Sequence, residues 1–380
     1  MGDSFIRVNI LVKDFKEVFY KGEIIMRKLA LLLGSLVVVA SASAKEVVPA
    51  PVVVEEAPVQ IVEKEVIVYR DKEEGFRPNG YVDLQYRYYG DTEGQSKVGK
   101  NDWNKNNDYR RLQLEGTINT TENQSFYYRV RTYDALTSDQ TITNKKDELK
   151  LQYNFDHGNL GDSKVNFVSR LQYVKDGSHA LRYEARFDFA EYMFNNDFVK
   201  TTEMVVAPYY EYTWNRTVEG DGDNYDNELG FYANFVNELP YGFAFQVELD
   251  TLGFHNYGDT KMHGVKDGNK DSDSNTTADV NIILAYGANL YSNEKMSVDF
   301  SAESGYDSYS WSDKVATGED HETYSLKTDP KVTLTYHATP SLDLYATAGA
   351  EYRNWKRTNE RSASNWRWQP FGIVGFRTTF

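Results

Sequence analysis

Charged side chains recur at alternate positions along much of this sequence. A single residue separates Arg129 from Arg131, and a single residue separates Glu248 from Asp250. Alternate residues of a β-strand share one face, so the members of each pair would point the same way. Ionised groups attract ions of the opposite sign, and burying them away from water is costly. We therefore expect these side chains to line a space that is filled with water.

The expected lining residues separate by sign along the chain. The first group is mostly basic and comprises Arg87, Arg111, Arg129, Arg131, Lys150, Lys164, Arg170, Arg182 and Arg186. Its fewer acids are Asp83, Glu115, Glu184 and Asp188. The second group is acidic and comprises Glu203, Glu211, Glu228, Glu248, Asp250, Asp279, Asp299 and Glu303. Because consecutive antiparallel strands are neighbours, one wall would be basic and the facing wall acidic. This arrangement predicts an electric field across the water path.

The sequence carries no motif that indicates catalysis or metal binding. Neither H-E-x-x-H nor G-x-S-x-G occurs, and the six histidines are scattered among expected loops and turns. The oxygen-rich segment 267–277 has Thr276 where a calcium-binding loop needs glycine. We expect no enzymatic activity, no metal ion and no cofactor, and a lipase or protease is the least favoured alternative.

The elements that would position the charges are strands with apolar residues at the intervening positions. From residue 79 onward, segments of about ten alternating residues are separated by breaks. The pattern predicts an all-β protein, a transmembrane antiparallel β-barrel of about fourteen strands, or sixteen if 321–337 or 252–277 is divided. Apolar residues that represent the expected outer face, one from each segment, are Leu84, Leu114, Val130, Leu151, Leu171, Leu181, Tyr210, Phe231, Phe245, Ile282, Phe300, Leu334, Leu344 and Val374.

The connections between these segments alternate in length. Those at 119–123 and 237–240 are short, whereas those at 90–108 and 307–322 are long and polar, and only 175–179 breaks the rule. Short periplasmic turns and long extracellular loops are the topology of outer-membrane barrels. A soluble β-sandwich would have no reason to alternate its loops in this way.

Composition is consistent with strands that contact lipid on one side and water on the other. The mean hydropathy is −0.63, yet 14% of the residues are aromatic. The absence of cysteine excludes disulfides and thiolate metal sites. A net charge of −15 argues against a nucleic-acid partner.

The N-terminal part divides into three segments before the expected barrel at 79–380. Residues 1–25 do not resemble the start of an exported protein and are expected to be an upstream, non-native extension. Residues 26–44 have the basic start, apolar centre and Ala-Ser-Ala end of a signal peptide, with cleavage after Ala44. Residues 45–78 are rich in proline, valine and glutamate, which indicates an extended periplasmic segment.

The last strand, 365–380, is amphipathic and ends on an aromatic residue. It resembles the assembly signal through which bacterial outer-membrane barrels engage the barrel-assembly machinery, with Phe376 and Phe380 as its aromatic members. Thr378 departs from that pattern, which usually has an aromatic residue third from the end.

Several longer stretches resemble the FomA-type major outer-membrane porins of fusobacteria. They are M-R-K-L-A-L-L-L-G-S, V-E-K-E-V-I-V-Y-R-D-K-E, N-G-Y-V-D-L-Q-Y-R-Y-Y-G and the closing F-R-T-T-F. The resemblance implies a homotrimer surrounded by outer-membrane lipids, with water-filled pores for passive diffusion of ions and small hydrophilic solutes. It also implies surface loops that contact host or bacterial ligands. An adhesin whose lumen is mostly closed is the alternative.

Overall fold

The computed structural model describes residues 75–94, 109–133, 146–218, 221–258, 262–266, 270–272, 274–307, 325–355 and 364–380. The expected extension 1–25, the signal peptide with its cleavage site at Ala44, and nearly all of segment 45–78 lie outside these residues. The strands all belong to one compact unit, Gly75–Phe380. Among the described residues, no helix is long and apolar enough to cross a membrane.

Strands make up almost all of the described part of this unit. The first eight are β1 (Asn79–Tyr89), β2 (Arg110–Thr121), β3 (Gln124–Tyr133), β4 (Glu148–Asn159), β5 (Asn166–Lys175), β6 (His179–Asp188), β7 (Lys200–Val218) and β8 (Asp221–Glu238). The others are β9 (Phe243–Tyr257), β10 (Met262–Lys266), β11 (Lys270–Ser272), β12 (Ser274–Ser292), β13 (Met296–Asp307), β14 (Ser325–Thr328), β15 (Lys331–Thr339), β16 (Leu342–Trp355) and β17 (Asn365–Thr379).

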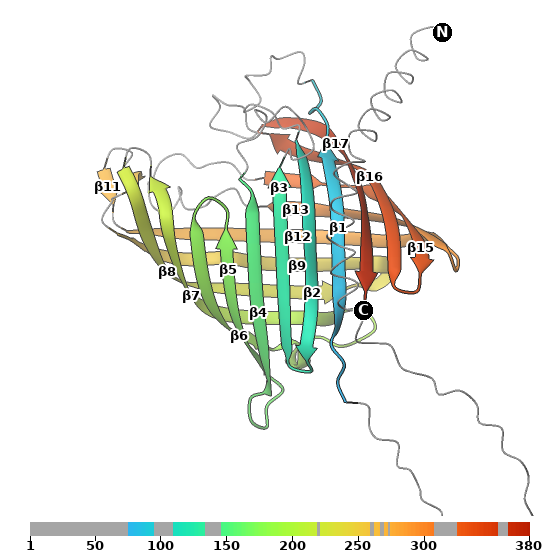
Figure 1. The fold of residues 1–380 in the computed structure, drawn as a ribbon, viewed down its shortest axis with the longest axis horizontal. Coiled ribbons are helices and arrows are strands. Elements are labelled where there is room, and N and C mark those ends of the chain that lie inside the picture. Colours follow the sequence, from blue (N-terminus) through green and yellow to red (C-terminus); the bar gives the residue numbers. More distant parts are fainter. Residues whose placement is uncertain are drawn as a thin grey trace, which may run out of the picture. The chain divides into compact units, whose positions relative to one another are not determined.

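The main sheet closes on itself. Its strands pair antiparallel with their neighbours along the chain, and β1 pairs with β17 (Figure 1). Strands β14 and β15 each pair with both β13 and β16, so together they occupy one position in the wall. The fifteen strands of this sheet therefore form a barrel of fourteen wall positions, which confirms the sequence prediction. Strands β10 and β11 form a separate two-stranded sheet.

Strict alternation gives the barrel an apolar exterior. Leu84 on β1 lies opposite Leu114 and Phe376, while the preceding residue, Asp83, lies opposite Glu115 and Arg377. Many large apolar side chains of the outer parity are exposed, among them Val130, Leu171, Leu181, Tyr210, Phe231, Ile282, Leu334, Leu344 and Val374. A closed barrel with an even number of strands and an apolar exterior is the form of bacterial outer-membrane proteins, and that membrane is where this protein resides.

The turns at one end of the barrel are short. Residues 122–123, 293–295 and 340–341 connect β2 to β3, β12 to β13 and β15 to β16. Two 3-10 turns, η2 (Ala190–Tyr192) and η3 (Pro240–Gly242), complete the same end. The connections at the opposite end are mostly longer. The exceptions are the predicted one between β5 and β6 and the one between β7 and β8, which are joined by residues 219–220.

Two connections that were expected to be long loops are largely strand. Strands β7 and β8 replace most of 215–227, and β9 to β12 occupy much of 252–277. The 19 residues of β7 span roughly 60 Å at about 3.3 Å each, which exceeds the roughly 30 Å hydrocarbon layer even when a strand is tilted. Strand ends that rise beyond lipid need no apolar face, so the alternation that identifies the rest of each strand is missing there.

Candidate functional site

The inner face of the barrel carries nearly all of the charged residues expected to line the water path. In-register residues of neighbouring strands share a face, and these residues align with one another: Glu211, for example, lies opposite Arg182 and Glu228. The residues that the structure places on the inner face are Arg87, Arg111, Arg129, Arg131, Lys150, Arg170, Arg182, Arg186, Glu203, Glu211, Glu228, Glu248, Asp279, Asp299 and Glu303.

Lys164 and Asp250 differ from this prediction. Lys164 lies in the turn before β5, is exposed, and has its Nζ 3.9 Å from Glu191 Oε2. Strand β5 begins only at Asn166, because the polar segment before it forms the turn. Asp250 is the extra residue of a β-bulge, since Leu249 and Thr251 pair with consecutive residues of β12, and it is exposed.

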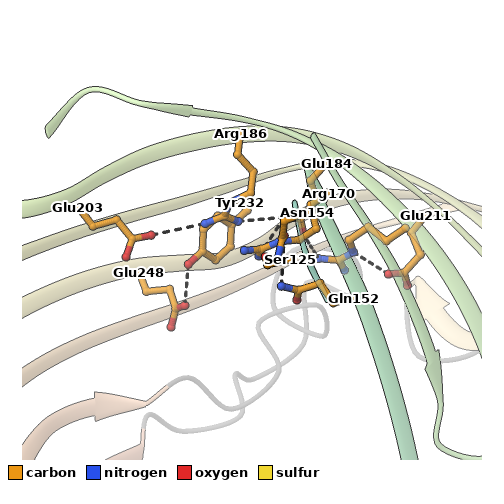
Figure 2. Close-up of polar contacts among 11 residues, drawn as sticks. Ser125, Gln152, Asn154, Arg170, Glu184, Arg186, Glu203, Glu211, Tyr232 and Glu248 are labelled. Carbon is orange, nitrogen blue, oxygen red and sulfur yellow. Dashed lines mark hydrogen bonds and ion pairs between the residues drawn. The ribbon is translucent and has the colours of Figure 1, made fainter. Parts of the chain in front are cut away.

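The basic and acidic walls meet between β6 and β7, where their charges form ion pairs (Figure 2). Glu184 on β6 lies at the centre, with its carboxylate oxygens 2.9 Å from Arg186, 3.4 Å from Arg170 and 3.7 Å from Arg182. Arg186 also reaches Glu203 on β7 at 3.5 Å. The charges that sequence analysis separated into two walls therefore neutralise one another at this boundary.

Arginine and tyrosine reinforce the same boundary. The guanidinium carbon of Arg182 lies 4.0 Å from the centre of the Tyr209 ring, and that of Arg186 lies 4.7 Å from the Tyr232 ring. Cations placed over an aromatic face gain electrostatic stabilisation, particularly when water is excluded. The side chain of Glu184 is only 4% exposed, so its three arginine neighbours are needed to compensate a buried carboxylate.

Acidic residues farther along the acidic wall accept hydrogen bonds from neutral side chains. Glu248 accepts hydrogen bonds from the Tyr232 hydroxyl and from Asn281, each at 3.2 Å. Asp299 accepts from Asn289 at 2.7 Å and from Ser297 at 2.8 Å. Neutral donors orient a carboxylate without cancelling its charge, so these contacts leave negative charge on this part of the inner face.

Other charged residues of the inner face were missed by sequence reasoning. Glu148 pairs with Arg129 at 2.6 Å and with Arg131 at 3.5 Å, although it stands at the start of β4, where the expected loop ended. On β16, Glu351 pairs with Arg353 at 3.0 Å, and on β17 Arg377 lies 3.5 Å from Asp83 of β1, an acid that the alternation did predict on the inner face. The signal that could have identified them is the same alternation.

A buried hydrogen-bonded cluster follows from the bulge in β9. The bulge reverses the face of the later residues, so His255 lies in register with Glu228 on the inner wall. Its Nδ1 is 2.8 Å from Asp226 Oδ2, and its Nε2 is 2.8 Å from the Thr277 hydroxyl. Asp226, Glu228 and His255 are residue types that bind metals, but these hydrogen bonds already engage both imidazole nitrogens.

A polar hollow of about 440 Å³ opens at the short-turn end of the inner face. Strands β2 to β7 and their turns line it, and its charged members are Glu122, Asp156, Arg170, Arg186, Asp188 and Glu203. A space of this size with a charged lining holds water more readily than an apolar cavity would. The arrangement can bind and guide hydrated ions, and no group in it is placed as a nucleophile with a base.

Comparisons with known proteins concern the barrel alone. No family model and no curated protein matches the chain. Similar solved structures include the COG4313 outer membrane channel from Pseudomonas putida F1, with 12% identity over 80% of this chain and 95% of that one and a TM-score of 0.29. An anion-selective porin from Comamonas acidovorans has 9% identity over 80% and 99% of the two chains and a TM-score of 0.31. Pseudomonas putida OprB has 6% identity over 80% and 94%, with a TM-score of 0.32.

Proposed function

We propose that the protein is an outer-membrane channel for passive diffusion of ions and small hydrophilic solutes. The observation that supports this function is the inner face, which carries mainly basic residues on β1 to β6 and acidic residues on β7 to β13 while the outer face is apolar. Barrels of eight strands are filled by their own side chains, whereas those of sixteen to eighteen leave an aqueous channel. Fourteen wall positions with ionised side chains inside favour a lumen that contains water.

Reconstitution tests the proposal directly. Purified, folded protein added to a planar lipid bilayer should produce discrete conductance steps in potassium chloride. The same protein unfolded by heat is the matched control and should produce none. A folded barrel that stays electrically silent would contradict the proposal.

The ion pairs at the β6–β7 boundary favour a second candidate, an adhesin whose lumen is mostly closed. Glu184 and its three arginines on β5 and β6 neutralise one another, and a lumen filled by side chains paired in this way would carry no ion current. This candidate predicts binding of host or bacterial surface ligands by the folded protein and no conductance. A channel that also binds such ligands would combine the two functions.

We also propose that the protein belongs to the FomA-type porins, forms a homotrimer and has no enzymatic activity. The quoted stretches of the sequence support the family and the trimer, and the lack of catalytic motifs supports the third point. Analytical ultracentrifugation in detergent tests the trimer. Lipase and protease assays on the same sample test for enzymatic activity.

A further inference from the structure

Aromatic rings gather on the inner face near the end of the barrel that carries the long loops. Tyr89 at the end of β1 stacks on Tyr109, which precedes β2, with ring centres 4.4 Å apart. Phe371 on β17 and Tyr133 on β3 extend the row, each with a ring centre 5.9 Å from its neighbour. Tyr89 and Phe371 are buried, so the cluster forms a fixed surface.

Two arginines lie directly beside these rings. Arg87 and Arg111 are opposite each other in the β1–β2 register. Arg87 donates a hydrogen bond from Nη1 to the Tyr89 hydroxyl at 3.0 Å, and its guanidinium carbon is 6.0 Å from the centre of the Phe371 ring. Arg111 lies opposite Tyr133 and is close enough to Tyr89 for electrostatic interaction.

The charges of these arginines have no carboxylate partner among the described residues. Every arginine of β3, β5 and β6 lies within 4 Å of a glutamate, but neither Arg87 nor Arg111 does. The Nε atom of each is buried without a hydrogen-bond partner. Two like charges opposite each other repel, and a buried donor without an acceptor is costly, so both groups would be stabilised by an anion.

We propose that Arg87 and Arg111, with the partly exposed rings of Tyr109 and Tyr133, form a binding site for organic anions that have a planar apolar body. Guanidinium groups present forked donors that match the oxygens of a carboxylate or a phosphate. The rings of Tyr109 and Tyr133, held in place by the buried Tyr89 and Phe371, offer an apolar surface for the ring of the same molecule. The site lies at the end of the barrel that carries the long loops, so it would select among solutes at the entrance to the proposed channel. This selecting role, unlike the binding itself, rests on the proposed function.

Block of the chloride current by three probes tests the site. Benzoate has both the carboxylate and the ring, acetate has only the carboxylate, and benzyl alcohol has only the ring. We expect benzoate to block at a concentration about tenfold below that of acetate, a factor that corresponds to about 1.4 kcal/mol, and benzyl alcohol to block weakly. Equal blocking concentrations for benzoate and acetate would overturn the proposal.

Variants identify the groups responsible. Arg87→Gln with Arg111→Gln should raise the blocking concentration of benzoate about tenfold, the factor expected when charged hydrogen bonds are lost. Lys164→Gln removes the same charge from the exposed turn before β5 and should leave block unchanged. Tyr109→Leu should weaken block by benzoate and leave block by acetate unchanged. Wild-type block in the double variant would overturn the assignment.

Calorimetry separates failure of the site from failure of the channel. Titration of benzoate into the folded protein in detergent should release heat in the wild type and not in the double variant, whether or not the barrel conducts. Binding without conductance would refute the proposed channel and keep the site, while conductance without binding would refute the site alone. If the double variant does not fold, Arg111→Gln and Arg87→Lys, tested singly, replace it.

Discussion

Arg182 on β6 and Glu211 on β7 form an ion pair across the boundary at which the interior changes sign. The Nε to Oε2 distance is 2.7 Å, and both side chains are 15% exposed. Charge-assisted hydrogen bonds of this length are among the strong ones in proteins, and partial burial limits their screening by salt. The ion pairs at this boundary therefore link the two walls. The net electric field in the lumen arises from the charged residues on either side of the boundary.

Glu184→Gln should destabilise the barrel strongly. The substitution removes the one carboxylate that contacts Arg170, Arg182 and Arg186 together, which leaves several positive charges close to one another. Breaking a buried pair by removing one partner costs about 3–5 kcal/mol. Urea unfolding in lipid vesicles, followed by tryptophan fluorescence, measures the loss.

Glu191→Gln is the matched control for that experiment. Glu191 also pairs with a cation, but it lies 3.9 Å from Lys164, and the two side chains are 73% and 63% exposed. Exposed pairs contribute about 0–1 kcal/mol. Equal stability changes in the two variants would show that the Glu184 cluster is solvated rather than buried.

Reversing Arg129 and Arg131 to glutamate should shift ion selectivity toward cations. Both lie on the basic wall and share Glu148, so reversal changes the local charge by four and makes that wall acidic. A change of wall charge alters the local ion concentration by a factor that we expect to exceed about two. The reversal potential in a potassium chloride gradient measures this. An unchanged potential, with heat-modifiable gel migration intact, would place these side chains off the ion path.

The sequence predicted the barrel well because lipid and water enforce a period of two. Each of the fourteen segments became a wall strand, including the one predicted within 321–337, whose described residues Asp329 and Pro330 separate β14 from β15. The same alternation also predicted correctly that most of the charged side chains lie on the inner face. The strand ends beyond lipid could not be predicted in this way, because residues such as those at the start of β8 are polar on both faces.

Bulges limit what parity alone can establish. His255 would face lipid if the alternation of β9 continued, but the extra residue at Asp250 turns it inward toward Asp226. Nothing in the composition of this stretch marks the bulge, which depends on pairing with two strands at once. The cluster around His255 was therefore accessible only through the structure.

Gly230→Ala should destabilise the inner wall. A Cβ atom at this position would lie 2.4 Å from the Tyr209 ring and 2.7 Å from the carbonyl oxygen of Leu252, so the ring and the backbone would have to move. Overpacking of this kind costs about 1–3 kcal/mol. Gly287→Ala on β12, where a Cβ meets nothing within 4 Å, is the control. Chemical unfolding of both variants measures the difference, and equal midpoints would contradict the close packing of Tyr209 on Gly230.

Deletion of Phe380 should impair closure of the barrel. Its backbone nitrogen donates to the Gly80 carbonyl at 3.2 Å, and its carbonyl accepts from the Gly80 nitrogen at 3.1 Å, so this residue forms the last pair between β17 and β1. Each backbone hydrogen bond contributes about 1 kcal/mol net in water, and an unpaired group beside lipid costs several. Refolding into detergent, followed by heat-modifiable gel migration, should yield less folded protein than the wild type. Phe380→Leu keeps both hydrogen bonds and should fold in detergent, but if the aromatic ring is the assembly signal it should accumulate poorly in the outer membrane of cells.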